Sequence, residues 1–112
     1  MSDRDELVVI VVFAPVEAAD AVRDAAASAG AGAIGDYRAC SFTAHGLGRF
    51  MPEDGADPAI GSVGTFETVE EQRIEVVCPR RSARAALEAM IAAHPYEEVA
   101  HHVYATIPRD AL

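Results

Sequence analysis

The stretch AAHPYEEVAHHVY, at residues 92–104, combines three histidines, two glutamates and two tyrosines. Imidazole nitrogens and carboxylate oxygens are ligands that zinc and copper accept in proteins. His94, Glu97 and a histidine from a neighbouring strand can converge across the turn that Pro95 enforces. With His45 as the third ligand, these residue types predict a site for a divalent cation, zinc or copper.

The same stretch also supports a structural interpretation. Adjacent residues of a regular strand point to opposite faces, so His101 and His102 do not bind one ion together. The residue before a proline is biased away from the helical region, which places His94 at the end of a helix. A ring there can pair with the last free carbonyls and with the negative end of the helix dipole. Both interpretations of His94 stay open at this point.

The segment GLGRF, at residues 46–50, is a second candidate site. Closely spaced glycines let backbone amides approach an anion, and Arg49 can pair with a phosphate or a carboxylate. The segment lacks the strand-then-helix context of nucleotide-binding loops, so a plain flexible loop is the alternative. Combined with the HPYEE turn, the segment predicts a ligand site made of His45, Gly46, Gly48, Arg49, Phe50, Tyr96, Glu97 and Glu98.

Catalytic arrangements have little support in this sequence. No Ser-His-Asp or Cys-His combination has the local sequence that usually accompanies it. The acid pair Glu70 and Glu71 is typical of a solvated face. Cys40 and Cys78 match no zinc pattern, and we expect both to be small core residues. The sequence therefore predicts that the chain is not an enzyme.

The first half of the chain predicts the elements that position these residues. Residues 7–13 are apolar on both parities, which is typical of a strand covered on both faces. A helix is expected within residues 14–32, where alanines and valines recur at helical spacing. Alternation then predicts a strand over residues 36–45. Residues 46–64 are rich in Gly and Pro and predict a long loop, a kind of segment that is often functional.

The second half repeats this rhythm. Alternation predicts a strand over residues 66–78, and a helix follows within residues 81–94 with Ser82 as its cap. A last strand is expected over residues 99–107. Strand-helix-strand units with right-handed crossovers give an α+β, ferredoxin-like βαββαβ sandwich. Its four-stranded antiparallel sheet would carry both helices on one face.

The first strand implies self-association. Helices on one face of the sheet leave the other face open, yet residues 7–13 have no polar side. We therefore expect other copies of the chain to cover the open face in a homo-oligomer. Residues 1–112 would form one domain, with loose ends at residues 1–6 and 108–112.

Charge and hydropathy limit the partners. The chain has 9 Lys and Arg against 18 Asp and Glu, which gives a formal net charge of −9. Nucleic acids and anionic membranes reward clustered cations, so neither is an expected partner. The long apolar run at residues 7–14 is too short to cross a bilayer, and its acidic flank is wrong for a signal peptide. The sequence predicts a cytoplasmic protein.

Three segments together resemble a known family: AGAGAIGDYRACSFTAHGLGRFMPEDGADPAIGSVG, EEQRIEVVCP and HPYEE. They are similar to the YqfO-type domain, which is found inserted in Nif-three-like dinuclear-metal proteins and here would stand alone. The likeness covers residues 8–107. HPYEE also resembles the CutA divalent-cation-tolerance proteins, which typically have a proline where Val99 stands. Both groups are similar in fold to the trimeric PII signalling proteins, so the resemblance implies a trimer.

The resemblance also implies a function. It favours a non-enzymatic, trimeric binding or regulatory module of the YqfO and PII-like kind. A small molecule or a partner protein would bind in clefts between subunits, near residues 46–64 and the HPYEE turn. Two alternatives stay open: a divalent-cation-binding protein in the CutA manner, and a regulatory piece of a dinuclear-metal enzyme supplied by another chain. The two-metal site of the larger proteins belongs to the surrounding domain, so its activity is not expected here.

Overall fold

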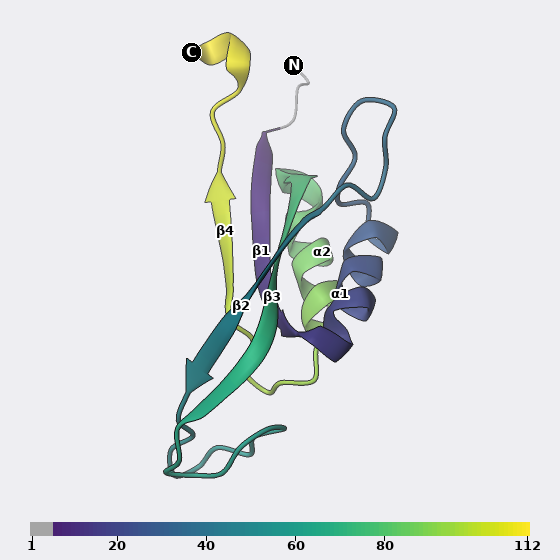
Figure 1. Ribbon diagram of the computed structural model, residues 1–112. Helices are drawn as coiled ribbons and strands as arrows, with labels where there is room; N and C mark the ends of the chain where they lie inside the picture. Colours follow the sequence, from purple (N-terminus) through teal and green to yellow (C-terminus); the bar gives the residue numbers. More distant parts are fainter. Residues whose placement is uncertain (1–5) are drawn as a thin grey trace.

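The computed structural model describes residues 6–112. Four antiparallel strands form one sheet in the order β2-β3-β1-β4, and two helices cover one face of it (Figure 1). The predicted ferredoxin-like fold is confirmed. The elements are β1 (Leu7–Pro15), α1 (Val16–Ser28), β2 (Phe42–Phe50), β3 (Glu67–Pro79), α2 (Arg80–Ala92), β4 (His101–Ala105) and a 3-10 turn η1 (Arg109–Ala111).

The core lies between the helices and the central strands. Alternate residues of β1 and β3 point toward the helices, because side chains alternate along a strand. The small alanines of the helix stripes let both helices pack closely against these residues. The core consists of Val8, Ile10, Val12, Ala14, Ala19, Val22, Ala26, Ala31, Ile74, Val76, Cys78, Ala86 and Met90. Burial raises the pKa of the Cys78 thiol, which fits its predicted place in the core.

The second strand begins later than residues 36–45 predict. Gly32 donates a backbone hydrogen bond to the Val77 carbonyl (2.7 Å), and Cys40 donates one to the Gly32 carbonyl (2.9 Å). These bonds hold residues 32–40 as a closed loop, so Cys40 is half-buried there rather than in the core. β2 therefore begins at Phe42 and includes the segment GLGRF, which the sequence placed in a loop.

Other boundaries also differ from the prediction. α2 begins two residues before Ser82, and the predicted cap is wrong because no side chain caps this helix. The last strand is shorter than residues 99–107 predict. Of the ends that we expected to be loose, residues 1–5 lie outside the described part, and residues 108–112 contain η1 and are exposed. Within residues 6–112 neither helix is both long and apolar enough to cross a membrane.

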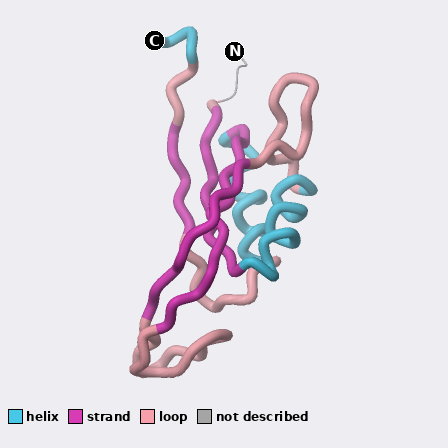
Figure 2. The backbone as a smooth tube through the Cα atoms, in the orientation of Figure 1, coloured by secondary structure: helices cyan, strands magenta, loops and turns pink. Residues whose placement is uncertain are grey.

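β2 and β3 extend beyond the rest of the sheet as a two-stranded arm, which consists of residues 46–50 and 67–71. The pairing of β1 with β3 ends at Pro15 and Glu71, whereas β2 and β3 stay paired as far as Phe50 and Glu67. Figure 2 shows this arm leading away from the helices. The radius of gyration is 15.6 Å, whereas a compact domain of this length has about 13 Å. The arm makes the chain elongated.

The helix-free face of the sheet, called the open face below, is rich in aromatic residues. Phe13 on β1 lies edge-on against His102 of β4, with 5.8 Å between ring centres, and His102 in turn contacts Tyr104. Val11 on this face is fully buried by its neighbours. Phe42 and Tyr104 are exposed there. The first strand is therefore apolar on both parities because it has neighbours on both faces, and the open face still presents aromatic rings to solvent.

Candidate functional site

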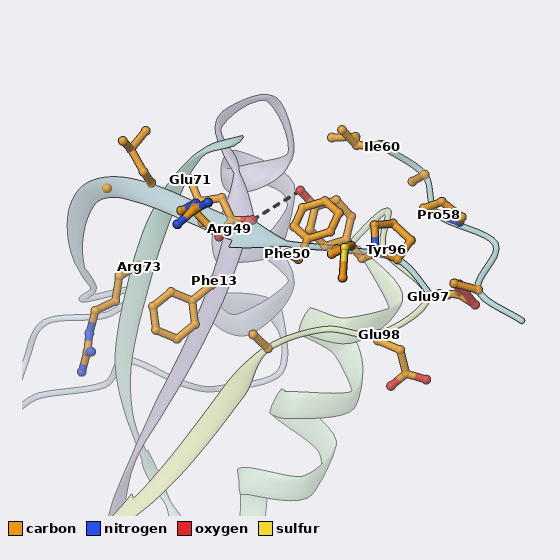
Figure 3. Close-up of a pocket in the computed structure, with 18 of the residues that line it drawn as sticks. Phe13, Arg49, Phe50, Pro58, Ile60, Glu71, Arg73, Tyr96, Glu97 and Glu98 are labelled. Atoms are coloured by element: carbon orange, nitrogen blue, oxygen red, sulfur yellow. Dashed lines mark hydrogen bonds between the residues drawn. The ribbon is translucent and has the colours of Figure 1, made fainter. Parts of the chain in front are cut away.

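One cavity of about 870 Å³ lies where the arm, the loop after β2 and the turn before β4 meet (Figure 3). The loop spans residues 51–66 and the turn spans residues 94–100. Four stretches of the sequence line the cavity: Phe13, residues within 44–60, the pair Glu71 and Arg73, and residues within 96–100. All eight predicted ligand residues line it: His45, Gly46, Gly48, Arg49, Phe50, Tyr96, Glu97 and Glu98.

His94 fixes the turn rather than lining the cavity. Its ring is buried, and Nε2 lies 2.7 Å from the carbonyl oxygen of Phe13. The backbone amide of Tyr96 donates to Nδ1 (3.1 Å), so Nε2 carries the hydrogen and donates to Phe13. Both ring nitrogens are thus engaged within the fold. The His94 ring therefore attaches the turn to β1.

The predicted metal ligands do not form a cluster. Across the described residues, no three His, Cys, Asp or Glu side chains are placed to hold a metal ion. His45 pairs with Gln72 across the ladder, so by alternation it lies on the side of β2 opposite Gly46 and Gly48. Glu97 accepts a hydrogen bond from the backbone amide of Asp57. The three candidate ligands therefore lie apart from one another, and the side chains of His94 and Glu97 are engaged in hydrogen bonds within the fold.

Glu97 connects the loop to the turn. Its bond to Asp57 links residues 40 positions apart in the sequence. Gly64 donates to the carbonyl of Pro52 (2.8 Å), which closes the loop on itself. Figure 3 shows the segment with Pro58 and Ile60 facing Tyr96 and Phe50 across the cavity. The loop therefore forms a wall of the cavity, held in place by Glu97.

Tyr96 and Glu71 form the polar contact inside the cavity. The Tyr96 hydroxyl donates to Glu71 Oε2 (3.3 Å), and its ring lies 6.1 Å from the ring centre of Phe50. Gly48 leaves room for this pair, because a Cβ there would collide with the Glu71 carboxylate. Burial, followed by the charge and hydrogen bond of Glu71 and the charge of Glu17, raises the pKa of Tyr96 to about 12. Tyr96 therefore remains a neutral hydrogen-bond donor at physiological pH.

Four strand residues that line the cavity from the open face were not predicted: Phe13, Ala44, Glu71 and Arg73. The sequence assigned Glu71 to a solvated acid pair. Their common signal is strand parity, since each lies on the side of its strand that faces away from the core. The loop residues Pro58 and Ile60 lacked such a signal, because a contact 40 residues away places them.

No family model matches this chain. It is 52% identical over 98 residues to a Mycobacterium leprae protein named GTP cyclohydrolase 1 type 2 homolog, and 48% identical over 100 residues to the Bacillus subtilis protein of that name. These matches cover 88% and 89% of this chain but 26% and 27% of the relatives. The chain therefore spans about a quarter of the length of the curated relatives it matches.

A solved structure supports the same conclusion. The crystal structure of a Bacillus cereus protein related to NIF3 superposes with a TM-score of 0.81 at 44% identity, and covers 93% of this chain and 26% of that one. The chain is a homologue of one segment of NIF3-related proteins. This confirms the resemblance to the YqfO-type domain. The CutA protein of Archaeoglobus fulgidus, at 18% identity and a TM-score of 0.66, shares the fold, with 92% of this chain and 85% of that one covered.

Proposed function

We propose that this chain is a non-enzymatic binding module that works as a homo-oligomer, with a trimer as the expected state. This proposal rests on the cavity between the arm, the loop after β2 and the turn before β4. Its volume of about 870 Å³ falls within the range of about 300–1,000 Å³ that is usual for small-molecule sites. Aromatic rings from Phe50 and Tyr96 provide apolar contact area inside it, and the ring of Phe13 lines it from β1.

The groups in the cavity favour binding over catalysis. Neither cysteine lines it, and His94 uses both ring nitrogens to hold the turn. The Tyr96 hydroxyl donates to a carboxylate, and its raised pKa makes it a poor proton donor near neutral pH. These groups fix a ligand in place more readily than they transfer protons.

The arm supports self-association. An isolated two-stranded ribbon is marginally stable in water, and exposed strand edges invite pairing or cover. β2 is an edge strand, and Phe42 and Leu47 on it are 64% and 70% exposed. A second copy that covers these side chains would stabilise the arm and give the cavity another wall.

The oligomeric state is tested by sedimentation equilibrium on untagged protein at micromolar concentration. The expected mass is three times the 11.8 kDa of one chain. A chain that stays monomeric under these conditions would contradict the oligomer part of the proposal and leave the cavity as a site within one subunit.

The ligand site is tested by screening a fragment library with two-dimensional amide NMR. Glycine amides resonate in a distinct region, so Gly46 and Gly48 report on the cavity floor. We expect fragments that shift these two amides to lose affinity in Phe50→Ala. The control is Tyr37→Ala, since Tyr37 is an exposed aromatic residue in the loop before β2 and lies outside the cavity and the arm. Equal losses in both variants, or no fragment that shifts either amide, would reject the cavity as the site.

A further inference from the structure

Glu71 places a negative charge without an ion-pair partner in the cavity. The residue is half-buried, and within residues 6–112 its carboxylate meets only the neutral Tyr96 hydroxyl. A half-buried carboxylate is more stable when a cation stands beside it, since partial burial weakens its solvation. Burial, and after it the charge and hydrogen bond of Glu71, raises the pKa of Tyr96, in line with the contact between the two side chains.

The nearest cations in the cavity wall are engaged elsewhere. Arg73 pairs with Glu75, at 2.9 Å between Nη2 and Oε1. The guanidinium of Arg49 lies 5.3 Å from the ring centre of Phe66. Arg49 also follows Gly48 directly on β2, so by alternation it leaves the strand on the side opposite Glu71. Within residues 6–112 no arginine therefore forms an ion pair with this carboxylate.

The walls around Glu71 favour a ligand that is both cationic and apolar. Tyr96 contacts the carboxylate through its hydroxyl, and its ring lies 6.1 Å from that of Phe50. Aromatic faces attract cations as well as apolar groups. Five carboxylates line the cavity against two guanidinium groups, which makes its field negative. The acidic members are Glu53, Asp54, Glu71, Glu97 and Glu98.

We propose that the cavity takes an organic cation, an amine, amidine or guanidine on an apolar or aromatic body, whose charge pairs with Glu71. This inference rests on the proposed function, since it names the ligand class of the same site. The charged end lies at Glu71 and the Tyr96 hydroxyl, and the body lies between Phe50 and the loop wall. Gly48 keeps the approach to the carboxylate free of side-chain atoms from β2.

The test uses three probes of the same shape and different charge: benzamidinium, benzamide and benzoate. Each is titrated at pH 7 and followed through the amides of Gly46 and Gly48. We expect benzamidinium to bind about tenfold more tightly than benzamide, the usual gain from a charge-assisted hydrogen bond, and benzoate to bind most weakly. Binding of benzoate or benzamide as tight as that of benzamidinium would overturn the inference. This comparison needs no variant, so it does not depend on how a mutant folds.

A matched pair of variants locates the charge. Glu71→Gln keeps an acceptor for Tyr96 and removes the charge, so benzamidinium should lose about tenfold in affinity while benzamide is unchanged. Glu70→Gln makes the same charge change on the opposite side of β3, where Glu70 is exposed and pairs with Leu47. It should leave both probes within about twofold. Equal losses in the two variants would show a general field effect and overturn the role of Glu71.

The outcomes separate this inference from the proposed function. Probes that shift the Gly48 amide regardless of their charge would reject the cationic ligand and leave the binding module in place. Probes and fragments that all fail to shift Gly46 and Gly48 would reject the cavity as a binding site, and the ligand class with it.

Discussion

The helix-covered part of the sheet and the arm share the strand β3 and differ in what covers them. In the helix-covered part, Ile10 and Ile74 are fully buried between the helices and the sheet. In the arm, β2 and β3 pair only with each other, and Leu47 is 70% exposed. One chain therefore completes its own core but leaves the arm and the cavity beside it accessible.

This difference separates stability from binding. Well-packed cores tolerate few changes, whereas surface loops positioned by a rigid frame often carry ligand contacts. Here the sheet lines the cavity directly through Phe13 and Arg73, and the buried ring of His94 bonds to the Phe13 carbonyl near the end of β1. The side chains of the loop and the turn can therefore differ while the sheet and the His94 contact hold the backbone of the turn in place.

The largest expected effect comes from shortening a core side chain. Ile10→Ala leaves a cavity in the central strand and should lower the free energy of unfolding by about 2–5 kcal/mol. Leu47→Ala, in the arm, should change it by less than about 0.5 kcal/mol in dilute protein. Urea denaturation measures both. Similar losses in the two variants would show that the arm is as well covered in solution as the core.

Two glycines extend the comparison to the backbone. Gly32 has a φ of 90°, and a Cβ there would lie 2.6 Å from the Cys40 carbonyl oxygen. Gly32→Ala should therefore destabilise the fold by about 2 kcal/mol. Gly46 lies in the arm and a Cβ there meets no atom within 4 Å, so Gly46→Ala should be nearly neutral. Thermal unfolding of both variants tests this, and a neutral Gly32→Ala would contradict the closed loop described for residues 32–40.

The fold could be predicted from the sequence because its periodicities are local. The double-sided apolar run of β1, the two helical stripes and the HPYEE turn each identify an element and its order. The start of β2 could not be predicted this way. Residues 36–41 continue the alternation of the strand, but they do not join the sheet. Instead, Cys40 donates a backbone hydrogen bond to Gly32, and Gly32 donates one to Val77 of β3. A contact 45 residues along the chain decides between loop and strand.

The lining of the cavity could be predicted in part for the same reason, whereas ligand binding by these residues stays a prediction. The sequence indicates that the GLGRF segment and the HPYEE turn carry the ligand residues, and the structure places these around one cavity. The position of Glu71 in the cavity was missed. Next to Glu70 it resembles a solvated acid, and only the position of Tyr96 distinguishes the two. Which of two neighbouring acids lies in a cavity depends on strand parity relative to a distant turn.

A smaller effect is expected where the loop meets the frame. Glu97→Ala removes the acceptor for the Asp57 amide, so that amide should exchange with solvent about tenfold faster. The free energy of unfolding should fall by about 1 kcal/mol or less, because a single exposed hydrogen bond contributes little. Hydrogen exchange followed by NMR measures the amide directly.

The neighbouring acid provides the control for this loop contact. Glu98→Ala removes the same charge from the same turn, and Figure 3 shows Glu98 pointing away from the loop that Glu97 meets. In Glu98→Ala the Asp57 backbone amide should exchange with solvent at the same rate as in the parent chain. Faster exchange in both variants would mean that the charge of the turn, rather than the hydrogen bond, holds the loop.

The smallest effect is spectroscopic and concerns Tyr96. Its pKa in the folded chain is about 12, whereas an unfolded tyrosine ionises near about 10. Because the folded value is raised, the stability that Tyr96 contributes is fully present below about pH 10 and is lost as the pH rises toward 12.

An absorbance titration of the three tyrosines should therefore show one late step that Tyr96→Phe removes and Tyr104→Phe retains. Glu71→Gln should move the late step to lower pH, since the Glu71 charge is among its causes. A late step that survives in Tyr96→Phe would place the raised pKa outside the cavity and contradict the burial and Glu71 contact described for Tyr96.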